Sequence, residues 1–246
     1  MTSDSPARVL RLRSRAPGSA LEALSSALGV VEAAFDSAAC DAWARAILAA
    51  RDAWTADFDG AQFSLGRAFY THLEERRLAA YFDRAPESDA LVERVAPGLQ
   101  AQMLGLIARF TGARVRPRRG FCGPGVHVFP AGGEVATRGG AVHFDTEGLP
   151  REHIARRRRA LSVVAMLLPA ERGGGLRLWP AVYVGRDAPS AAERGPPATV
   201  RYRVGDAVGF DSYRLHQIRP FTGHRPRVSA TVHAAEVDDG LWETWF

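Results

Sequence analysis

A short polar segment, AVHFDTE at residues 141–147, most strongly constrains how this chain can fold. It places His143 and Asp145 two positions apart, with apolar Phe144 between them. Side chains in a β-strand alternate between two faces. We therefore predict a strand over residues 140–145, with His143 and Asp145 on the same face. Such a pair can act together only if the fold brings a partner from elsewhere in the chain.

That partner is expected in a second segment, residues 204–235, which carries His216 and the motif Arg227-Val-Ser229. Gly205-Asp206 is typical of a turn into a strand, and His216 lies on the predicted strand that follows. Alternation over the last predicted strand places Arg227 and Ser229 on one face together with Thr231 and His233. The opposite face is apolar, so the polar face is expected to line the interior of a barrel.

Two histidines and one carboxylate are the ligand set with which non-haem Fe(II) oxygenases hold their metal, leaving other coordination positions open. His143, Asp145 and His216 supply that set. Ten residues separate His216 from Arg227. The planar guanidinium of arginine can bind the distal carboxylate of a 2-oxo acid through two parallel hydrogen bonds.

The order H-x-D, then H, then R-x-S resembles the Fe(II)/2-oxoglutarate dioxygenase superfamily over roughly residues 120–235. The resemblance implies an α+β chain with a double-stranded β-helix (jelly-roll) core. It further implies an enzyme that uses Fe(II), 2-oxoglutarate and O2. His143, Asp145 and His216 would be the catalytic metal ligands, and Arg227 and Ser229 would bind the C5 carboxylate of 2-oxoglutarate.

Asp145 also bears on the type of reaction that the resemblance implies. Related halogenases have a small residue at that position, which leaves a coordination site for halide. A carboxylate here fills the site, so hydroxylation is expected in place of halogenation. Desaturation and ring closure remain open alternatives.

The substrate is expected to be a small molecule, such as a free amino acid or a derivative from a specialised pathway. This rests on Glu147, which follows Asp145 on the same predicted face, and on nearby arginines. Arg177 and Trp179 share a predicted strand face and are further candidates to line the pocket. The run Arg156–Arg159 is either a substrate-covering anion patch or an ordinary solvated surface, and the sequence favours the second.

Other functions remain as alternatives. Nucleic-acid oxygenases of this superfamily tend to carry R-x-N-x-x-x-R, whereas here Ser229 replaces the asparagine and His233 the second arginine. Hydroxylation of a protein side chain stays open. A non-catalytic, cupin-like metal-binding protein is the alternative from another class, because one fold hosts many functions. Of the isolated histidines, His127 is expected beside 2-oxoglutarate or in a core hydrogen bond.

Composition supports one large domain of 246 residues, with 46% hydrophobic residues. The chain has no lysine, so its net charge of +5 comes from arginine and is poor evidence for a nucleic-acid partner. The chain contains no apolar run of about 18 residues, so no membrane span is predicted. The two cysteines form no disulfide framework, which suits the cytoplasm. The oligomeric state is not predicted.

The chain is expected to divide into three parts. Residues 1–18 form a disordered N-terminus, residues 19–112 a helical region that buttresses the sheet, and residues 113–246 the catalytic core, in one integrated domain. The helical spacing of apolar residues predicts helices over residues 20–35, 42–58, 63–82 and 86–110, the last of them split or kinked at Pro97-Gly98.

Overall fold

Two long antiparallel strands, β7 (Ala160–Leu168) and β14 (Arg227–Asp238), form the centre of the fold. The computed structural model describes residues 8–13, 16–186 and 189–246. The large sheet runs in the order β1 (Val9–Arg11), β2 (Gly29–Ala33), β11 (Asp206–Asp211), β7, β14, β6 (Gly125–Phe129), β4 (Gln62–Leu65) and β3 (Thr55–Asp57). Two further strands extend it, since β15 (Leu241–Trp245) pairs with β14 and with β5 (Arg114–Pro117).

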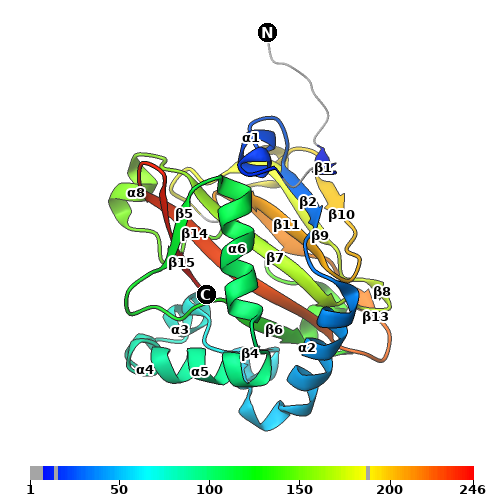
Figure 1. The fold of residues 1–246 in the computed structure, drawn as a ribbon. Coiled ribbons are helices and arrows are strands. Elements are labelled where there is room, and N and C mark those ends of the chain that lie inside the picture. Colours follow the sequence, from blue (N-terminus) through cyan, green and yellow to red (C-terminus); the bar gives the residue numbers. More distant parts are fainter. Residues whose placement is uncertain (1–7, 14–15, 187–188) are drawn as a thin grey trace.

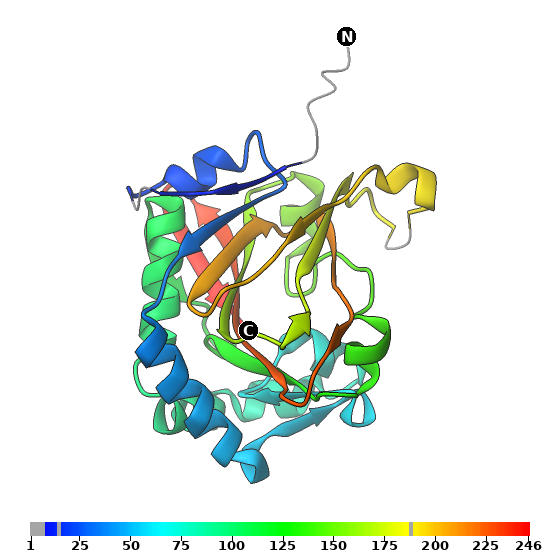
Figure 2. The same ribbon diagram turned by 90° about the vertical axis from the view of Figure 1, so that its right-hand side faces the viewer.

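A smaller sheet lies opposite the large one. It consists of β10 (Ala198–Val200), β9 (Leu176–Val182) and β12 (Arg214–Ile218), and β8 (Arg172–Gly173) pairs with β13 (Phe221–Thr222) nearby. Seen from the side, the strands of the two sheets surround a common interior (Figure 2). The predicted α+β class with a jelly-roll core is confirmed.

Helices cover the outer face of the large sheet. Of these, α2 (Ser37–Ala49), α5 (Ala85–Val95) and α6 (Leu99–Thr111) contact its strands, α1 (Ser19–Ala23) packs on α6, and α4 (Leu78–Asp83) contacts both α3 (Phe69–Glu74) and α5. Elsewhere, α7 (Glu134–Arg138) contacts β13 and α9 (Ala191–Arg194) contacts β9. The other short elements are α8 (Arg151–Ala155) and 3-10 turns at Arg51–Ala53 and Phe58–Gly60. Figure 1 shows α6 lying across β7 and β14. Its buried residues Met103, Leu106, Ile107 and Phe110 recur with helical spacing and pack on apolar side chains of that sheet. The split at Pro97-Gly98 between α5 and α6 agrees with the predicted interruption.

The N-terminal part contains more strand than the sequence predicted. Residues 9–11, expected to be disordered, form β1, while residues 1–7 lie outside the described residues. The predicted helix over residues 20–35 ends at Ala23, and β2 follows it. Residues 63–65, expected to be helical, belong to β4, which lies between β3 and β6. Partners from distant parts of the chain override the local apolar spacing, because each strand buries its side chains against them. The expected boundary at residue 112 therefore falls within one continuous sheet.

The segment around the H-x-D motif also differs from its prediction. Residues 140–145 do not form a strand, and their only ladder contact among the described residues is an isolated bridge between His143 and His216. Cys40 and Cys122 are both buried free thiols. No helix in the described parts of the chain is long and apolar enough to cross a bilayer.

Gly209 on β11 allows the closest approach of α6 to the large sheet. A Cβ atom built at Gly209 would lie 2.4 Å from a ring carbon of Phe110, so any side chain there overpacks the core. We predict that Gly209→Ala lowers the free energy of unfolding by about 1–3 kcal/mol, measured by denaturant titration.

Gly105 on α6 provides the matched control. It is exposed, and a Cβ atom there meets nothing within 4 Å. Gly105→Ala should raise the free energy of unfolding by about 0.5–1 kcal/mol, because alanine loses less backbone entropy in a helix. Equal effects of the two substitutions would contradict this packing.

Candidate metal and cosubstrate site

One pair of backbone hydrogen bonds brings the two polar segments of the sequence together. The His143 amide donates to the His216 carbonyl at 3.1 Å, and the His216 amide donates to the His143 carbonyl at 2.9 Å. Two residues further on, the Asp145 amide donates to the Ser212 carbonyl at 2.9 Å. An irregular loop is thereby held along β12, which places side chains from both segments beside each other.

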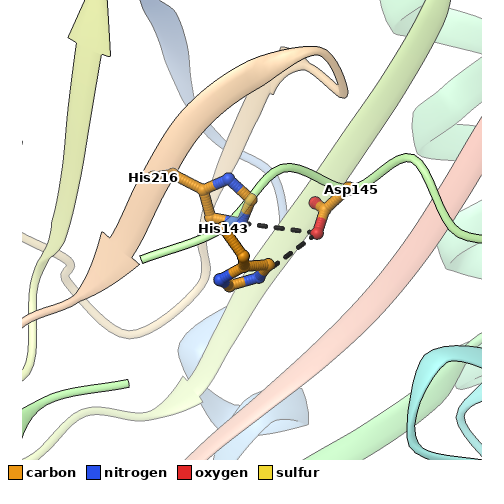
Figure 3. A group of neighbouring side chains, drawn as sticks. All are labelled: His143, Asp145 and His216. Carbon is orange, nitrogen blue, oxygen red and sulfur yellow. Dashed lines mark ion pairs between the residues drawn. The ribbon is translucent and has the colours of Figure 1, made fainter. Parts of the chain in front are cut away.

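The side chains of His143, Asp145 and His216 point toward one another from that loop and from β12 (Figure 3). Asp145 Oδ1 lies 3.4 Å from His143 Nε2 and 3.4 Å from His216 Nε2. One ligand atom from each residue falls within 4.8 Å of the others. Ligand atoms held at right angles at roughly 2.0–2.2 Å from an ion lie about 3 Å apart. The three residues therefore fit one metal ion, with the cavity side left open.

The protonation pattern of both histidines suits metal binding. His143 Nδ1 lies 2.9 Å from the Ala141 carbonyl, and His216 Nδ1 lies 3.0 Å from the Arg214 carbonyl. A carbonyl only accepts, so each Nδ1 carries a proton, and Nε2 is in both rings the nitrogen that could give its lone pair to a metal at the shared centre.

Electrostatic interactions make the carboxylate a strong ligand. Burial favours a higher pKa for Asp145, but His216, His233 and His143 together lower that pKa well below its ordinary value. Burial disfavours protonated His143, yet the hydrogen bond and charge of Asp145 raise the pKa of His143 to about 9. A positive charge is thus stabilised at this centre, and a metal ion held there would displace the proton of His143.

Arg227 lies on β14, deep in the same interior, and its side chain is 1% exposed. Its Nε donates to the Gly174 carbonyl at 3.1 Å and its Nη1 to Ser229 Oγ at 3.0 Å. Its guanidinium carbon lies 5.2 Å from the centroid of the Phe129 ring and 5.5 Å from that of Tyr202. Burial lowers the pKa of Arg227, and among the described residues no carboxylate forms an ion pair with it. A buried cation without a counter-ion fits an anionic ligand.

A cavity of about 620 Å³ joins the metal-ligand cluster to Arg227. Its wall includes His143, Asp145 and His216, as well as the four alternating residues of β14 that the sequence placed on one face. Those four residues are Arg227, Ser229, Thr231 and His233. Apolar side chains complete the inner wall, among them Val164, Leu176, Phe210 and Ile218.

Of the three candidate substrate residues, one lines the cavity and two do not. Glu147 lines the cavity, and burial together with the charge of Asp145 raises its pKa to about 7. Arg177 and Trp179 do not line it: Trp179 packs against Phe144, and the Arg177 guanidinium carbon lies 5.6 Å from the centroid of the Trp179 ring. Leu176, the neighbour of Arg177 on the alternate face of β9, is buried and lines the cavity instead.

The cavity wall also contains residues that sequence reasoning missed. They are Phe58, Gln62, Tyr70, Glu74, Glu134 and Arg138. Gln62 on β4 donates a hydrogen bond to the Tyr70 hydroxyl on α3 at 2.5 Å. Nothing in their local sequence signals a pocket, because their position depends on the pairing of β4 with β6.

The arginine run Arg156–Arg159 lies outside this cavity and makes local contacts. Arg156 pairs with Glu152 at 2.9 Å, Arg158 donates to the Val237 carbonyl at 3.1 Å, and Arg159 pairs with Glu236. These contacts agree with the solvated surface that the sequence favoured.

The metal cluster generates a direct prediction. His143→Ala, Asp145→Ala and His216→Ala should each weaken Fe(II) binding by more than the roughly 10–100-fold loss seen when only an outer-shell partner is removed. Anaerobic calorimetric titration measures the affinity, and circular dichroism checks the fold. His224→Ala, at an exposed turn, is the control and should bind Fe(II) as the wild type does. Unchanged Fe(II) affinity in all three variants would rule out this centre.

No family model and no curated protein matches the sequence. Solved structures with a similar fold do exist. A 2OG-Fe(II) oxygenase family oxidoreductase from Burkholderia pseudomallei shares 16% identity over 95% of this chain and 97% of its own, with a TM-score of 0.53. An N-substituted L-amino acid dioxygenase from Burkholderia ambifaria, in complex with alpha-KG, shares 15% identity over 93% and 91%, with a TM-score of 0.58.

The epimerase SnoN, in complex with Fe3+, alpha ketoglutarate and nogalamycin RO, is a third similar structure. It shares 18% identity over 87% of this chain and 83% of its own, with a TM-score of 0.55. The likeness in all three cases extends over most of both chains. This protein therefore has the fold of the Fe(II)/2-oxoglutarate oxygenases.

Proposed function

We propose that the protein is an Fe(II)- and 2-oxoglutarate-dependent dioxygenase that hydroxylates an unactivated C–H bond of a small molecule. One observation carries the proposal: a two-histidine, one-carboxylate cluster faces the same cavity as a buried arginine to which no described carboxylate is paired. A metal site alone would not need Arg227, and an anion site alone would not need the cluster. A bifunctional ligand such as 2-oxoglutarate, which has an oxo acid at one end and a carboxylate at the other, serves both.

In this proposal His143, Asp145 and His216 hold the iron, while Arg227 and Ser229 hold the C5 carboxylate. When bound, iron, 2-oxoglutarate and O2 together supply the oxidising power, and the products are hydroxylated substrate, succinate and CO2. The chain's own work is to position the reactants and exclude water. Val164, Leu176 and Phe210 form an apolar wall that helps to exclude water. Electrostatic contacts inside the cavity are stronger as a result, because the local dielectric constant is lower.

The substrate is proposed to be an amino acid or a derivative of one. A volume of about 620 Å³ has room for 2-oxoglutarate and a second small molecule. Support also comes from the structurally similar protein that is an N-substituted L-amino acid dioxygenase. The test is succinate release from 2-oxoglutarate with Fe(II) and O2 across a panel of free and N-substituted amino acids. Substrate-dependent succinate is expected, and its absence across the panel would contradict this substrate class.

Arg227 provides the prediction on cosubstrate binding. Arg227→Ala should weaken 2-oxoglutarate binding by roughly 2–5 kcal/mol, the cost of removing one partner of a buried charge pair. Ser229→Ala should cost about 1 kcal/mol, the net value of one hydrogen bond. Calorimetric titration of 2-oxoglutarate into the metal-loaded protein measures both losses.

The matched control is Arg225→Ala, which removes an exposed arginine from the segment just before β14. It should leave 2-oxoglutarate affinity unchanged. Equal affinity in the wild type and in the Arg227 variant would show that Arg227 does not bind the cosubstrate.

Asp145 provides the prediction on reaction type. Its carboxylate takes one position of the metal centre and brings a negative charge, which leaves no place for halide beside the cosubstrate. In excess chloride or bromide, mass spectrometry of the product should show a gain of one oxygen and no halogen. A halogen isotope pattern would refute the role of Asp145, and a loss of two hydrogens would indicate desaturation or ring closure.

A further inference from the structure

A chain of buried hydrogen bonds leads from the N-terminal part of the large sheet to the cavity wall. Asp57 on β3, Ser64 on β4 and His127 on β6 are 0%, 0% and 5% exposed. Ser64 Oγ donates to Asp57 Oδ2 at 2.6 Å and lies 3.3 Å from His127 Nδ1. Ser64 and His127 are direct partners in the register of β4 and β6. None of these contacts has a role in the proposed metal or cosubstrate binding.

The chain determines which nitrogen of His127 carries the proton. A hydroxyl group has one hydrogen, and the nearer, charged Asp57 carboxylate takes it. Burial raises the pKa of Asp57 above its ordinary value, while the Ser64 hydrogen bond and the charge of Arg77, whose Nη2 lies 3.4 Å from Asp57 Oδ1, act in the opposite direction and favour the ionised carboxylate. Ser64 Oγ can then only accept from His127, so Nδ1 holds the proton and Nε2 keeps a lone pair. Burial lowers the pKa of His127 to about 3, so the ring is neutral at physiological pH.

The lone pair on Nε2 is available for a ligand. His127 lines the cavity, and in the described parts of the chain its ring makes its one hydrogen bond through Nδ1. On its other side it pairs in register with Ser229, which binds Arg227. 2-Oxoglutarate at Arg227 offers only acceptor oxygens, so it cannot donate to Nε2. A donor to Nε2 therefore has to come from another occupant of the cavity, and the second reactant is the one that the chain can select.

The charges on the cavity wall indicate what that donor is. Glu74 and Glu147 both line the cavity, and none of the ion pairs of the described residues involves either of them. Arg138, also on the wall, is paired with Glu134 at 3.4 Å. Arg227 serves the cosubstrate. Glu74 is exposed, and Glu147 offers the oxygens of its carboxyl group as hydrogen-bond acceptors. The wall therefore offers acceptor oxygens, together with the exposed Glu74 carboxylate, to a cation that carries hydrogen-bond donors.

We propose that Asp57 and Ser64 fix His127 as a hydrogen-bond acceptor for the N–H group of a cationic amine substrate. His127 is thereby a residue that determines specificity. The inference rests on the proposed function only in taking the amine as the molecule that is oxidised.

Nuclear magnetic resonance tests the fixed tautomer without any turnover. Protein labelled with 15N in its histidines is loaded with Zn(II) and 2-oxoglutarate, and His127→Gln assigns the His127 signals. We expect the proton on Nδ1 and an unprotonated Nε2 across about pH 6 to 8, where ordinary histidines titrate. Ser64→Ala should release the ring into a mixture of tautomers. Ser162→Ala, at a serine that bonds His233 instead, is the control and should leave the His127 signals unchanged.

Three results would overturn the fixed tautomer. They are a proton on Nε2, a charged ring at neutral pH in the wild type, or a His127 pattern that Ser64→Ala does not alter. Since Zn(II) supports no oxidation, the result is independent of the succinate assay. Failure of that assay would count against the proposed function and leave the tautomer untouched.

Matched probes test the ligand class in the same sample. n-Butylammonium should shift the Nε2 signal of His127, whereas n-butyltrimethylammonium, which has no N–H, should not. A shift with both probes or with neither would overturn the proposed contact. n-Butanol is a neutral hydrogen-bond donor and so separates the effect of charge from that of hydrogen-bond donation. A shift of the His127 Nε2 signal with n-butanol, but not with n-butylammonium, would show that the ligand is not a cation. His127→Phe removes the reporting ring, so calorimetric titration is used for this variant, which should bind n-butylammonium more weakly than the wild type while 2-oxoglutarate still binds.

Discussion

The site depends on the two backbone hydrogen bonds between His143 and His216. They join a loop that follows α7 to a strand of the small sheet and so bring together side chains that are far apart in sequence. The loop has no other ladder contact among the described residues, and Asp145 is fixed by its own bond to Ser212. Because backbone groups do this work, the three side chains remain free to point at one centre and to bind a metal there.

Arg227 shows the second constraint, which is the free-energy cost of burying a charge. The fold offsets part of that cost with the Gly174 carbonyl, the Ser229 hydroxyl and the faces of Phe129 and Tyr202. Gly174 reaches this position with φ +67°, a conformation that suits glycine. Since the described residues contribute no carboxylate, we propose that a ligand supplies the missing anion. The arginine and the metal cluster together therefore define a ligand with two different ends.

The sequence predicted the chemistry better than the backbone that carries it. His143, Asp145 and His216 were identified by residue type and spacing, although the strand assumed for residues 140–145 is a loop. Ser64 lies in a segment whose apolar spacing equally suits a helix, so its link to His127 could not be foreseen. Arg177 was assigned to the wrong face of β9, because alternation alone does not say which face is internal. The misplacement of Ser64 and that of Arg177 both depend on pairing between distant segments, which local sequence does not encode.

The most direct test of the central claim is a crystal structure grown without oxygen in the presence of Fe(II) and 2-oxoglutarate. Anomalous scattering should place one iron on Nε2 of His143, Nε2 of His216 and the Asp145 carboxylate. The C5 carboxylate of 2-oxoglutarate should lie on Arg227 and Ser229. Iron bound by other residues, or 2-oxoglutarate bound away from Arg227, would contradict the conclusion that the metal and the arginine serve the same ligand.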